Sequence, residues 1–149
     1  MKKELQNKLF EKYKFLEKSA KAGTMFSACG IECGDGWFDL IDHLFAEMEE
    51  ISPEILITQM KSKFASLDLN FNCGTDLEKF ISLSVIVDEY TEKSKWICEN
   101  CGKPGSLRSI RGWLKTLCDK DYRKEEDEMN MMFPLEDRIF PKPKKEKIE

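Results

Sequence analysis

The chain has a single histidine, His43, and few of the patterns that mark enzymes or membrane proteins. No catalytic triad, phosphate-binding loop or cofactor fingerprint is present, so an enzyme is not the first expectation. No window approaches the roughly 18 uninterrupted apolar residues of a membrane span. The first residues, from Met1 to Lys8, lack the continuous apolar stretch of a signal peptide. We therefore expect a cytosolic protein that does not enter a membrane.

A large excess of charge of either sign is also missing. The formal net charge is −4 although 35% of the 149 residues are charged, so the chain has no general attraction to nucleic acid or membranes. Hydrophobic residues make up 41% and include ten Phe and three Trp, which is enough for the core of one domain. In a reducing compartment the six Cys are not expected to form a disulfide framework.

Cysteine is used in a pattern typical of metal sites. Cys98 and Cys101 form a Cys-x-x-Cys turn, and Cys118 follows after sixteen intervening residues. The turn brings two thiolates to one side, and a carboxylate, here Asp121, is an acceptable though less usual zinc ligand. The spacing therefore predicts a zinc-ribbon-like lobe over residues 96–122, with Zn²⁺ on these four side chains.

The fourth ligand is not decided by the spacing. Besides Asp121, the candidates are His43, Cys73 and a water molecule. An open position that holds water would permit zinc-dependent hydrolysis. However, three thiolates donate much charge to the metal and weaken its Lewis acidity, which favours a structural zinc.

A glycine-rich segment, residues 27–37, precedes the second expected helix. Three glycines within residues 30–36 permit the close approach of another group, and the turn exposes amide donors at the start of the helix. In the simpler interpretation Asp35 caps that helix. The alternative is a ligand site, with the amides as a phosphate cradle, formed by Glu32, Gly34, Asp35 and Gly36.

Hydrophobic periodicity predicts an α+β fold, with three helices around a small antiparallel sheet and the zinc-ribbon-like lobe. The expected helices are 2–21, 36–50 and 76–93, and the expected strands are 55–60 and 66–72, joined by a hairpin through 61–65. The predicted organisation is an α+β core with its N-terminal helix at 1–95, the lobe at 96–122, and a charged, partly disordered extension at 123–149.

Basic residues are concentrated near the cysteines. Residues 93–124 contain nine Lys or Arg against three acids, a local charge of +6, and the remainder of the chain is −10. Basic side chains interleaved with aromatic ones suit phosphate contacts combined with base stacking. Arg108, Arg111 and Trp113 are therefore candidates for nucleotide or nucleic-acid binding. Alternatively, these charges are solvated or neutralise the zinc thiolates.

Two motifs together resemble a known family. They are the segment Gly30–Ile41, which reads GIECGDGWFDLI, and the knuckle with Cys98, Cys101-Gly102, Pro104-Gly105, Gly112-Trp113 and Cys118-Asp119; the segment Lys61–Leu67 before a strand also fits. Over about residues 28–122 the chain resembles small uncharacterised proteins encoded by tailed bacteriophages. Their last knuckle usually reads Cys-Asp-x-His, which implies a site of three Cys and one His, and Asp121 stands here in the His position. The resemblance implies a phage origin and a location in the host cytoplasm.

Three functions follow as hypotheses. The first is a non-enzymatic phage accessory protein with structural zinc that binds a host protein, for example in counter-defence. The second is a nucleotide or nucleic-acid binder, including a sponge for signalling nucleotides. The third is a zinc-dependent hydrolase. A homo-oligomer is compatible with each of them.

Overall fold

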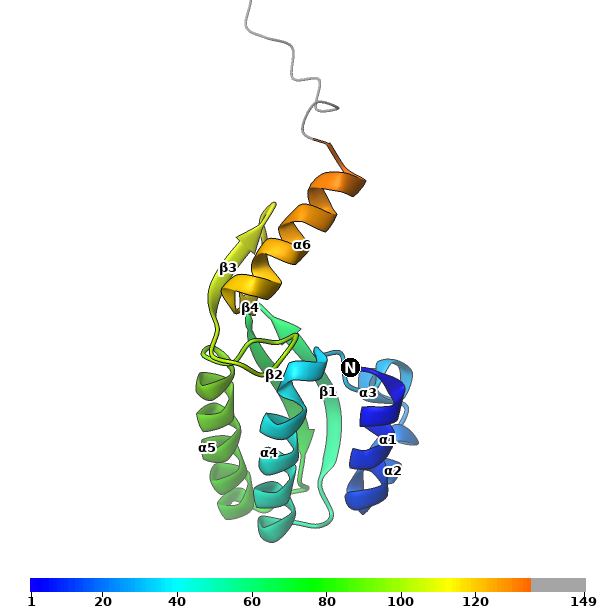
Figure 1. The fold of residues 1–149 in the computed structure, drawn as a ribbon. Helices are drawn as coiled ribbons and strands as arrows, with labels where there is room; N and C mark the ends of the chain where they lie inside the picture. The colour runs from blue at the N-terminus through cyan, green and yellow to red at the C-terminus, as the bar shows by residue number, and fades with distance from the viewer. Residues whose placement is uncertain (135–149) are drawn as a thin grey trace, which may run out of the picture.

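The computed structural model describes residues 1–134, and within them the chain has the predicted α+β architecture (Figure 1). Helices surround one antiparallel hairpin, and a second hairpin lies beside the cysteines. The elements are α1 (Lys3–Lys12), α2 (Lys14–Ala20), α3 (Met25–Cys29), the 3₁₀ helix η1 (Asp35–Trp37), α4 (Phe38–Ile51), β1 (Leu56–Lys63), β2 (Ser66–Asn72), α5 (Leu77–Ser94), β3 (Ser106–Ile110), β4 (Trp113–Leu117) and α6 (Asp119–Met132). No helix within residues 1–134 has the length and apolarity to span a membrane.

The N-terminal segment differs from the single helix predicted over residues 2–21. It forms α1 and α2, which are separated at Tyr13, a residue in extended conformation with φ −114° and ψ 106°. The Tyr13 side chain is buried, and its hydroxyl donates a hydrogen bond of 2.7 Å to the Asp42 carboxylate on α4. The break lets Leu9 on α1 and Leu16 on α2 both enter the core. Local periodicity could not predict it, because the stabilising contact comes from a distant helix.

The β1–β2 hairpin is the centre of the core. The predicted pairing is confirmed, with Lys63 opposite Ser66 at the turn, so the loop is only Phe64 and Ala65. Helices α2 and α3 pack on β1, and α5 packs on β2 and α4. The largest fully buried side chains of this core are aromatic: Trp37, Tyr13, Phe15, Phe26 and Phe45. Burying one such side chain stabilises the fold by about 1.5–3 kcal/mol.

Helix α5 begins with a side-chain cap and presents two different faces. The Asp76 carboxylate accepts the Lys79 amide hydrogen at 3.1 Å. Leu83, Val87 and Tyr90 are buried against the core. A second apolar stripe of α5 is exposed, and it consists of Leu77, Phe80, Ile81 and Val85. This face of the helix is in contact with solvent in the monomer.

The C-terminal part is a hairpin followed by a helix. β3 and β4 pair antiparallel around a two-residue turn of Arg111 and Gly112. Helix α6 packs on both strands and runs across residue 122, where the lobe was expected to give way to the extension. Part of the predicted extension, up to Met132, is therefore helical. The disorder expected toward residue 149 falls largely on 135–149, outside the described residues.

Candidate metal centre

The turn of residues 98–103, called the knuckle from here on, carries Cys98 and Cys101 and is shaped by short-range backbone hydrogen bonds. The Cys98 amide donates to the Lys103 carbonyl at 2.7 Å, and the Gly102 amide donates to the Cys98 carbonyl at 2.9 Å. Gly102 has φ +75°, a left-handed conformation that a glycine adopts without strain. This turn places the sulfurs of Cys98 and Cys101 on the same side. The remaining two side chains come from the start of α6, where Cys118 is the N-cap and Asp121 lies in the first turn.

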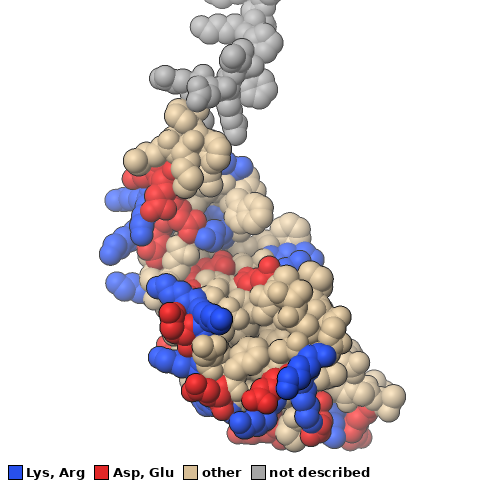
Figure 2. Space-filling model, turned by 90° about the vertical axis from the view of Figure 1, so that its right-hand side faces the viewer, with Lys and Arg blue, Asp and Glu red and all other residues tan. Residues whose placement is uncertain are grey.

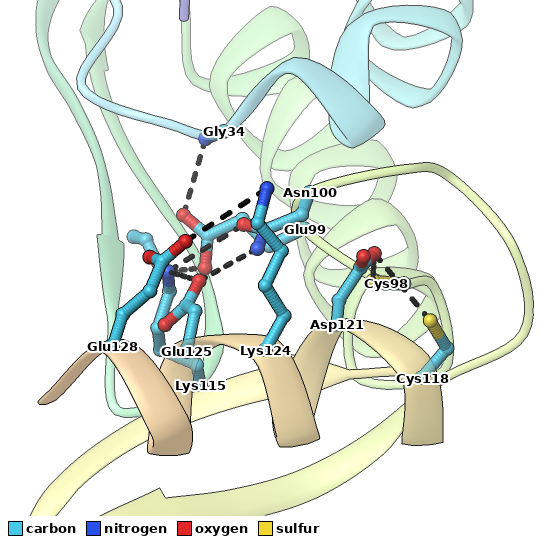
Figure 3. Close-up of polar contacts among 11 residues, drawn as sticks. Gly34, Cys98, Glu99, Asn100, Lys115, Cys118, Asp121, Lys124, Glu125 and Glu128 are labelled. Atoms are coloured by element: carbon cyan, nitrogen blue, oxygen red, sulfur yellow. Dashed lines mark hydrogen bonds and ion pairs between the residues drawn. The ribbon is translucent and has the colours of Figure 1, made fainter. Parts of the chain in front are cut away.

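The four predicted ligands lie together. The ligand atoms of Cys98, Cys101, Cys118 and Asp121 are all within 4.8 Å of one another. The Cys101 and Cys118 sulfurs are 3.7 Å apart. Asp121 Oδ2 is 3.2 Å from the Cys98 sulfur and 3.4 Å from that of Cys118 (Figure 3).

These separations have the dimensions of a tetrahedral metal centre. Bonds of about 2.3 Å to sulfur and about 2.0 Å to oxygen give tetrahedral edges of about 3.8 Å between sulfurs and about 3.5 Å between sulfur and oxygen. The pair Cys101 and Cys118 is far too widely spaced for a disulfide, whose S–S distance is about 2.05 Å. The cluster can therefore hold a metal ion without rearrangement of the backbone.

Asp121 is the fourth member of the cluster. Cys118 and Asp121 are three positions apart on α6, so their side chains share one face of the helix. The other two protein candidates lie elsewhere: His43 is exposed on α4, and Cys73 follows β2 and packs against the main core. The Asp121 carboxylate thus lies at the fourth ligand position, for which His43, Cys73 and water were the alternatives.

The pKa values of these side chains indicate which protons a bound metal ion would have to displace. Hydrogen bonding to the Asp121 carboxylate raises the pKa of the Cys101 thiol to about 12. Burial is the largest cause that raises the pKa of Cys98. Hydrogen bonds from the Cys101 and Cys98 thiols, in turn, lower the pKa of Asp121. A metal must displace thiol protons at neutral pH, so its affinity falls on acidification.

The glycine-rich segment docks on this knuckle. The Gly34 amide donates to Glu99 Oε1 at 3.1 Å, and the Gly36 amide donates to the Glu99 carbonyl at 2.8 Å. The indole N–H of Trp37 donates to the Ile97 carbonyl at 2.8 Å. A Cβ atom on Gly34 would lie 2.2 Å from the Glu99 carbonyl oxygen, so a side chain has no room there. The predicted close approach is confirmed, and the approaching group is the knuckle itself.

This docking removes the donors of the predicted phosphate cradle, because the Gly34 and Gly36 amides are already bonded. The prediction that Asp35 caps the following helix is wrong. Gly34 is the N-cap of η1, and the Asp35 carboxylate instead accepts the Lys2 amide hydrogen at 2.7 Å. Glu32 pairs through its backbone with β1 and has an exposed side chain. The structure therefore does not assemble these four residues into one ligand site.

Glu99 is the functional residue that the sequence did not reveal. It lies inside the Cys-x-x-Cys turn and is only 5% exposed. Its carboxylate accepts the Gly34 amide hydrogen and, at 2.9 Å, the Ser62 hydroxyl of β1. Its own amide donates to the Thr116 carbonyl of β4 at 2.9 Å. The Glu99 side chain thus joins the glycine-rich segment and β1, and its backbone joins β4. Figure 3 shows the contact between Glu99 and Gly34. The only sequence signal was an acid between two cysteines.

The basic residues of the lobe are largely engaged within the molecule. Arg108 pairs with Asp119 and lies 5.2 Å from the centre of the Tyr122 ring. Arg111 donates to Asn130 on α6 at 3.0 Å. Lys115 pairs with Glu125 on α6, again within the molecule. Figure 2 shows basic and acidic side chains interspersed on the face in view, without a continuous basic patch.

A cleft of about 710 Å³ lies between the two hairpins, beside the metal centre. Residues 61–64 of the β1–β2 hairpin and residues 112–115 of the β3–β4 hairpin line it, together with Glu32 and Glu99. Of the predicted ligand-binding residues, Glu32 and Trp113 line this cleft, and Trp113 is 73% exposed. The volume of the cleft is that of a typical ligand or peptide side-chain pocket.

The candidate metal centre, the docked glycine-rich segment and the cleft adjoin one another at Glu99, which lies between Cys98 and Cys101, binds Gly34 and lines the cleft. Each part of this region is made by segments far apart in the sequence: residues 32–37, β1, the knuckle, β4 and the start of α6. Searches among protein-family models, curated proteins and solved structures find no match to the chain.

Proposed function

We propose that the chain is a non-enzymatic binding module whose C-terminal lobe is held by a structural Zn²⁺ ion. The observation that carries this proposal is the closed set of four protein donors, Cys98, Cys101, Cys118 and Asp121, at tetrahedral spacing. A catalytic zinc site has three protein ligands and an open position for water or substrate, whereas a structural site is closed. Zinc-dependent hydrolysis is therefore the weakest of the three hypotheses.

The donor chemistry favours zinc over other divalent ions. Soft thiolates in tetrahedral arrangement select zinc or iron–sulfur chemistry, whereas magnesium and calcium prefer oxygen ligands in larger shells. Three thiolates, one carboxylate and Zn²⁺ give the site a formal charge of about −2.

The lobe needs the metal because its own core is small. Cys98, Ile110 and Leu117 are the fully buried apolar residues of its cluster, and Cys118, Tyr122 and Met129 pack against them. Such a small core supplies little stabilisation by burial alone, and metal binding compensates in small domains. The zinc ion would join the knuckle to the start of α6, two segments that otherwise meet through few apolar contacts.

We propose a host protein as the partner of this module. The resemblance to tailed-phage proteins supports a target in the host cytoplasm, and a defence factor is one such target. The cleft supports a binding role, because Phe64 and Trp113 line it while 76% and 73% exposed. Exposed aromatic side chains on rigid turns are typical anchors of protein interfaces. Assembly into a homo-oligomer remains a prediction.

The nucleotide or nucleic-acid hypothesis keeps one supporting observation. Trp96 and Trp113 are both exposed in the lobe, where they are available for base stacking. Against it, Arg108 and Lys115 are paired with acids, and the glycine-rich amides are bonded to the knuckle. Binding that weakens steeply with salt would favour this second function.

The test is the metal content of the purified protein, measured together with the absorbance ratio that reports bound nucleotide. We expect one zinc per chain in the wild type, loss of zinc in Cys98→Ser, and a weakened or lost site in Asp121→Ala. Cys29→Ser is the matched control, because Cys29 is an exposed cysteine outside the cluster. A wild-type protein without zinc, or zinc retained in Cys98→Ser, would overturn the structural-zinc proposal.

A further inference from the structure

The edge of β4 has backbone groups that are free to pair. Hydrogen-bonded and non-hydrogen-bonded positions alternate along an antiparallel pair. The Thr116 carbonyl points away from β3, because it accepts the Glu99 amide hydrogen. Leu114 lies two residues earlier on β4, so its N–H and C=O point away from β3, on the same side as the Thr116 carbonyl. Within residues 1–134, no hydrogen bond outside the β3–β4 ladder uses these two groups.

The facing edge of β1 is already covered. Glu32 forms a parallel bridge with it, in which the Ser62 amide donates to the Glu32 carbonyl at 3.0 Å and the Glu32 amide donates to the Met60 carbonyl at 3.0 Å. Of the two strands that line the cleft, β4 therefore has the open edge next to Leu114. An extended chain has main-chain groups with the right spacing to pair there.

Phe64 and Trp113 lie at the tips of the two hairpins, Phe64 in the turn between β1 and β2 and Trp113 directly after the turn between β3 and β4. Phe64 has φ 51° and Ala65 has φ 62°, where a tight hairpin normally has Asn-Gly or another pair that tolerates left-handed backbone. A bulky residue in this region is strained. The Phe64 ring is also exposed, so neither burial nor the local backbone conformation accounts for a phenylalanine at position 64. Strained residues of this kind cluster at ligand-binding sites.

Two lysines on the cleft wall have no partner in an ion pair among the residues that the structure describes. Lys61 and Lys63 are two residues apart on β1, and neither forms an ion pair within the described chain. Lys115 is paired with Glu125, and both carboxylate oxygens of Glu99 accept hydrogen bonds. Glu32 is the remaining acid of the lining. Lys61 and Lys63 can therefore pair with acidic side chains of a bound segment, but the wall lacks the run of free cations that tracks a nucleic-acid backbone.

We infer that this cleft binds an extended peptide segment of the partner protein, which pairs with β4 at Leu114 and inserts an apolar side chain between Phe64 and Trp113. Acidic residues on that segment pair with Lys61 and Lys63. This assignment rests on the proposed binding function and specifies its partner chemistry. An alternation of apolar and acidic residues is expected in the segment, because side chains of a strand alternate between its two faces.

A library of short random peptides, selected on the zinc-loaded full chain, tests this assignment. We expect enrichment of sequences with alternating apolar and acidic residues. A labelled enriched peptide, followed by fluorescence anisotropy, should bind about tenfold or more weakly to Phe64→Gly and to Trp113→Ala, as for anchor residues of interfaces. Glycine fits the φ of Phe64, so this variant keeps its fold. Trp96→Ala is the matched control, since Trp96 is 69% exposed and does not line the cleft.

Hydrogen exchange distinguishes strand addition from docking through side chains alone. The Leu114 amide should exchange more slowly in the peptide complex, and an unchanged rate would overturn the pairing with β4. If the peptides are not enriched relative to a selection on the double variant of Phe64→Gly and Trp113→Ala, the cleft is not the site. Equal peptide affinity of Trp113→Ala and Trp96→Ala would also overturn the cleft as the site. Binding of oligo(dT) in place of peptides would do the same and favour nucleic acid. Zinc content, measured on every sample, separates these outcomes from failure of the structural-zinc proposal.

Discussion

Gly36→Ala tests the docking of the glycine-rich segment on the metal knuckle. A Cβ atom on Gly36 would lie 2.3 Å from the Cys98 carbonyl oxygen, 2.4 Å from the Gly102 nitrogen and 2.6 Å from the Cys101 nitrogen. All three neighbours are backbone atoms, so no side chain can rotate away. The two segments must separate, and the hydrogen bond from the Gly36 amide to Glu99 is stretched or lost.

The expected cost follows from two contributions. Overpacking costs about 1–3 kcal/mol, and loss of a hydrogen bond adds about 1 kcal/mol. Gly36 has no positive φ, so alanine is not strained by the backbone conformation itself. We therefore expect the free energy of unfolding to fall by about 2–4 kcal/mol. Because the displaced atoms belong to the knuckle, zinc affinity should fall as well.

Gly74→Ala provides the comparison. Gly74 has φ +80°, and a Cβ atom added there would have no neighbour within 4 Å, so the substitution introduces backbone strain without a clash. Such strain costs about 1–2 kcal/mol. Urea unfolding of the zinc-loaded proteins, with a zinc-release assay in parallel, measures both effects. Equal stability of the two variants, or normal zinc affinity in Gly36→Ala, would refute the docking argument. A phosphate cradle, by contrast, would leave stability unchanged and abolish ligand binding.

Three further substitutions test separate contacts. Glu99→Ala leaves the Gly34 amide and the Ser62 hydroxyl without their acceptor, so unfolding free energy in urea should fall by about 2–4 kcal/mol, and less in Glu99→Gln. Phe64→Gly should relieve backbone strain and raise the free energy of unfolding by up to about 1 kcal/mol, seen as a higher melting temperature; a lower melting temperature contradicts the φ argument. Burial opposes ionisation of Asp42, but hydrogen bonds from Lys12 and Tyr13 prevail and lower its pKa. Its stabilisation is therefore present above about pH 4 and lost as pH falls through the folded pKa, so Asp42→Asn should flatten the acid limb of a stability–pH curve.

The parts of the fold that the sequence predicts are those fixed by local patterns. Alternation of apolar and polar residues in 66–72 predicts the strand β2, whose limits in the structure are Ser66 and Asn72. The spacing of Cys98, Cys101 and Cys118 predicts the metal cluster, because a knuckle and a helix start are both short-range structures. Asp121 joins them through its place in the first turn of α6.

The parts that it does not predict depend on contacts between distant segments. The break at Tyr13 is stabilised by Asp42, and the amides of the glycine-rich segment bind Glu99, some sixty residues later in the chain, which a single sequence gives no means of pairing. For the same reason the basic composition of residues 93–124 does not reveal which of its charges are paired. Lys115 and Arg111 are engaged by Glu125 and Asn130 of α6, which lie beyond that window.

The position of Glu99 connects the metal to the cleft. Zinc on Cys98 and Cys101 would fix the turn between them, and this turn holds the Glu99 backbone against Thr116 of β4. With the backbone fixed, the Glu99 carboxylate holds Ser62, the residue between the two lysines of β1 that line the cleft. This turn would thus act together with the direct hydrogen bond from the Thr116 hydroxyl to the Ala65 carbonyl, 2.7 Å long, in setting the spacing of the two hairpins and the gap between Phe64 and Trp113. A binding surface that depends on a small core gains its rigidity in this way, since the lobe has few buried apolar residues to keep the hairpins in place.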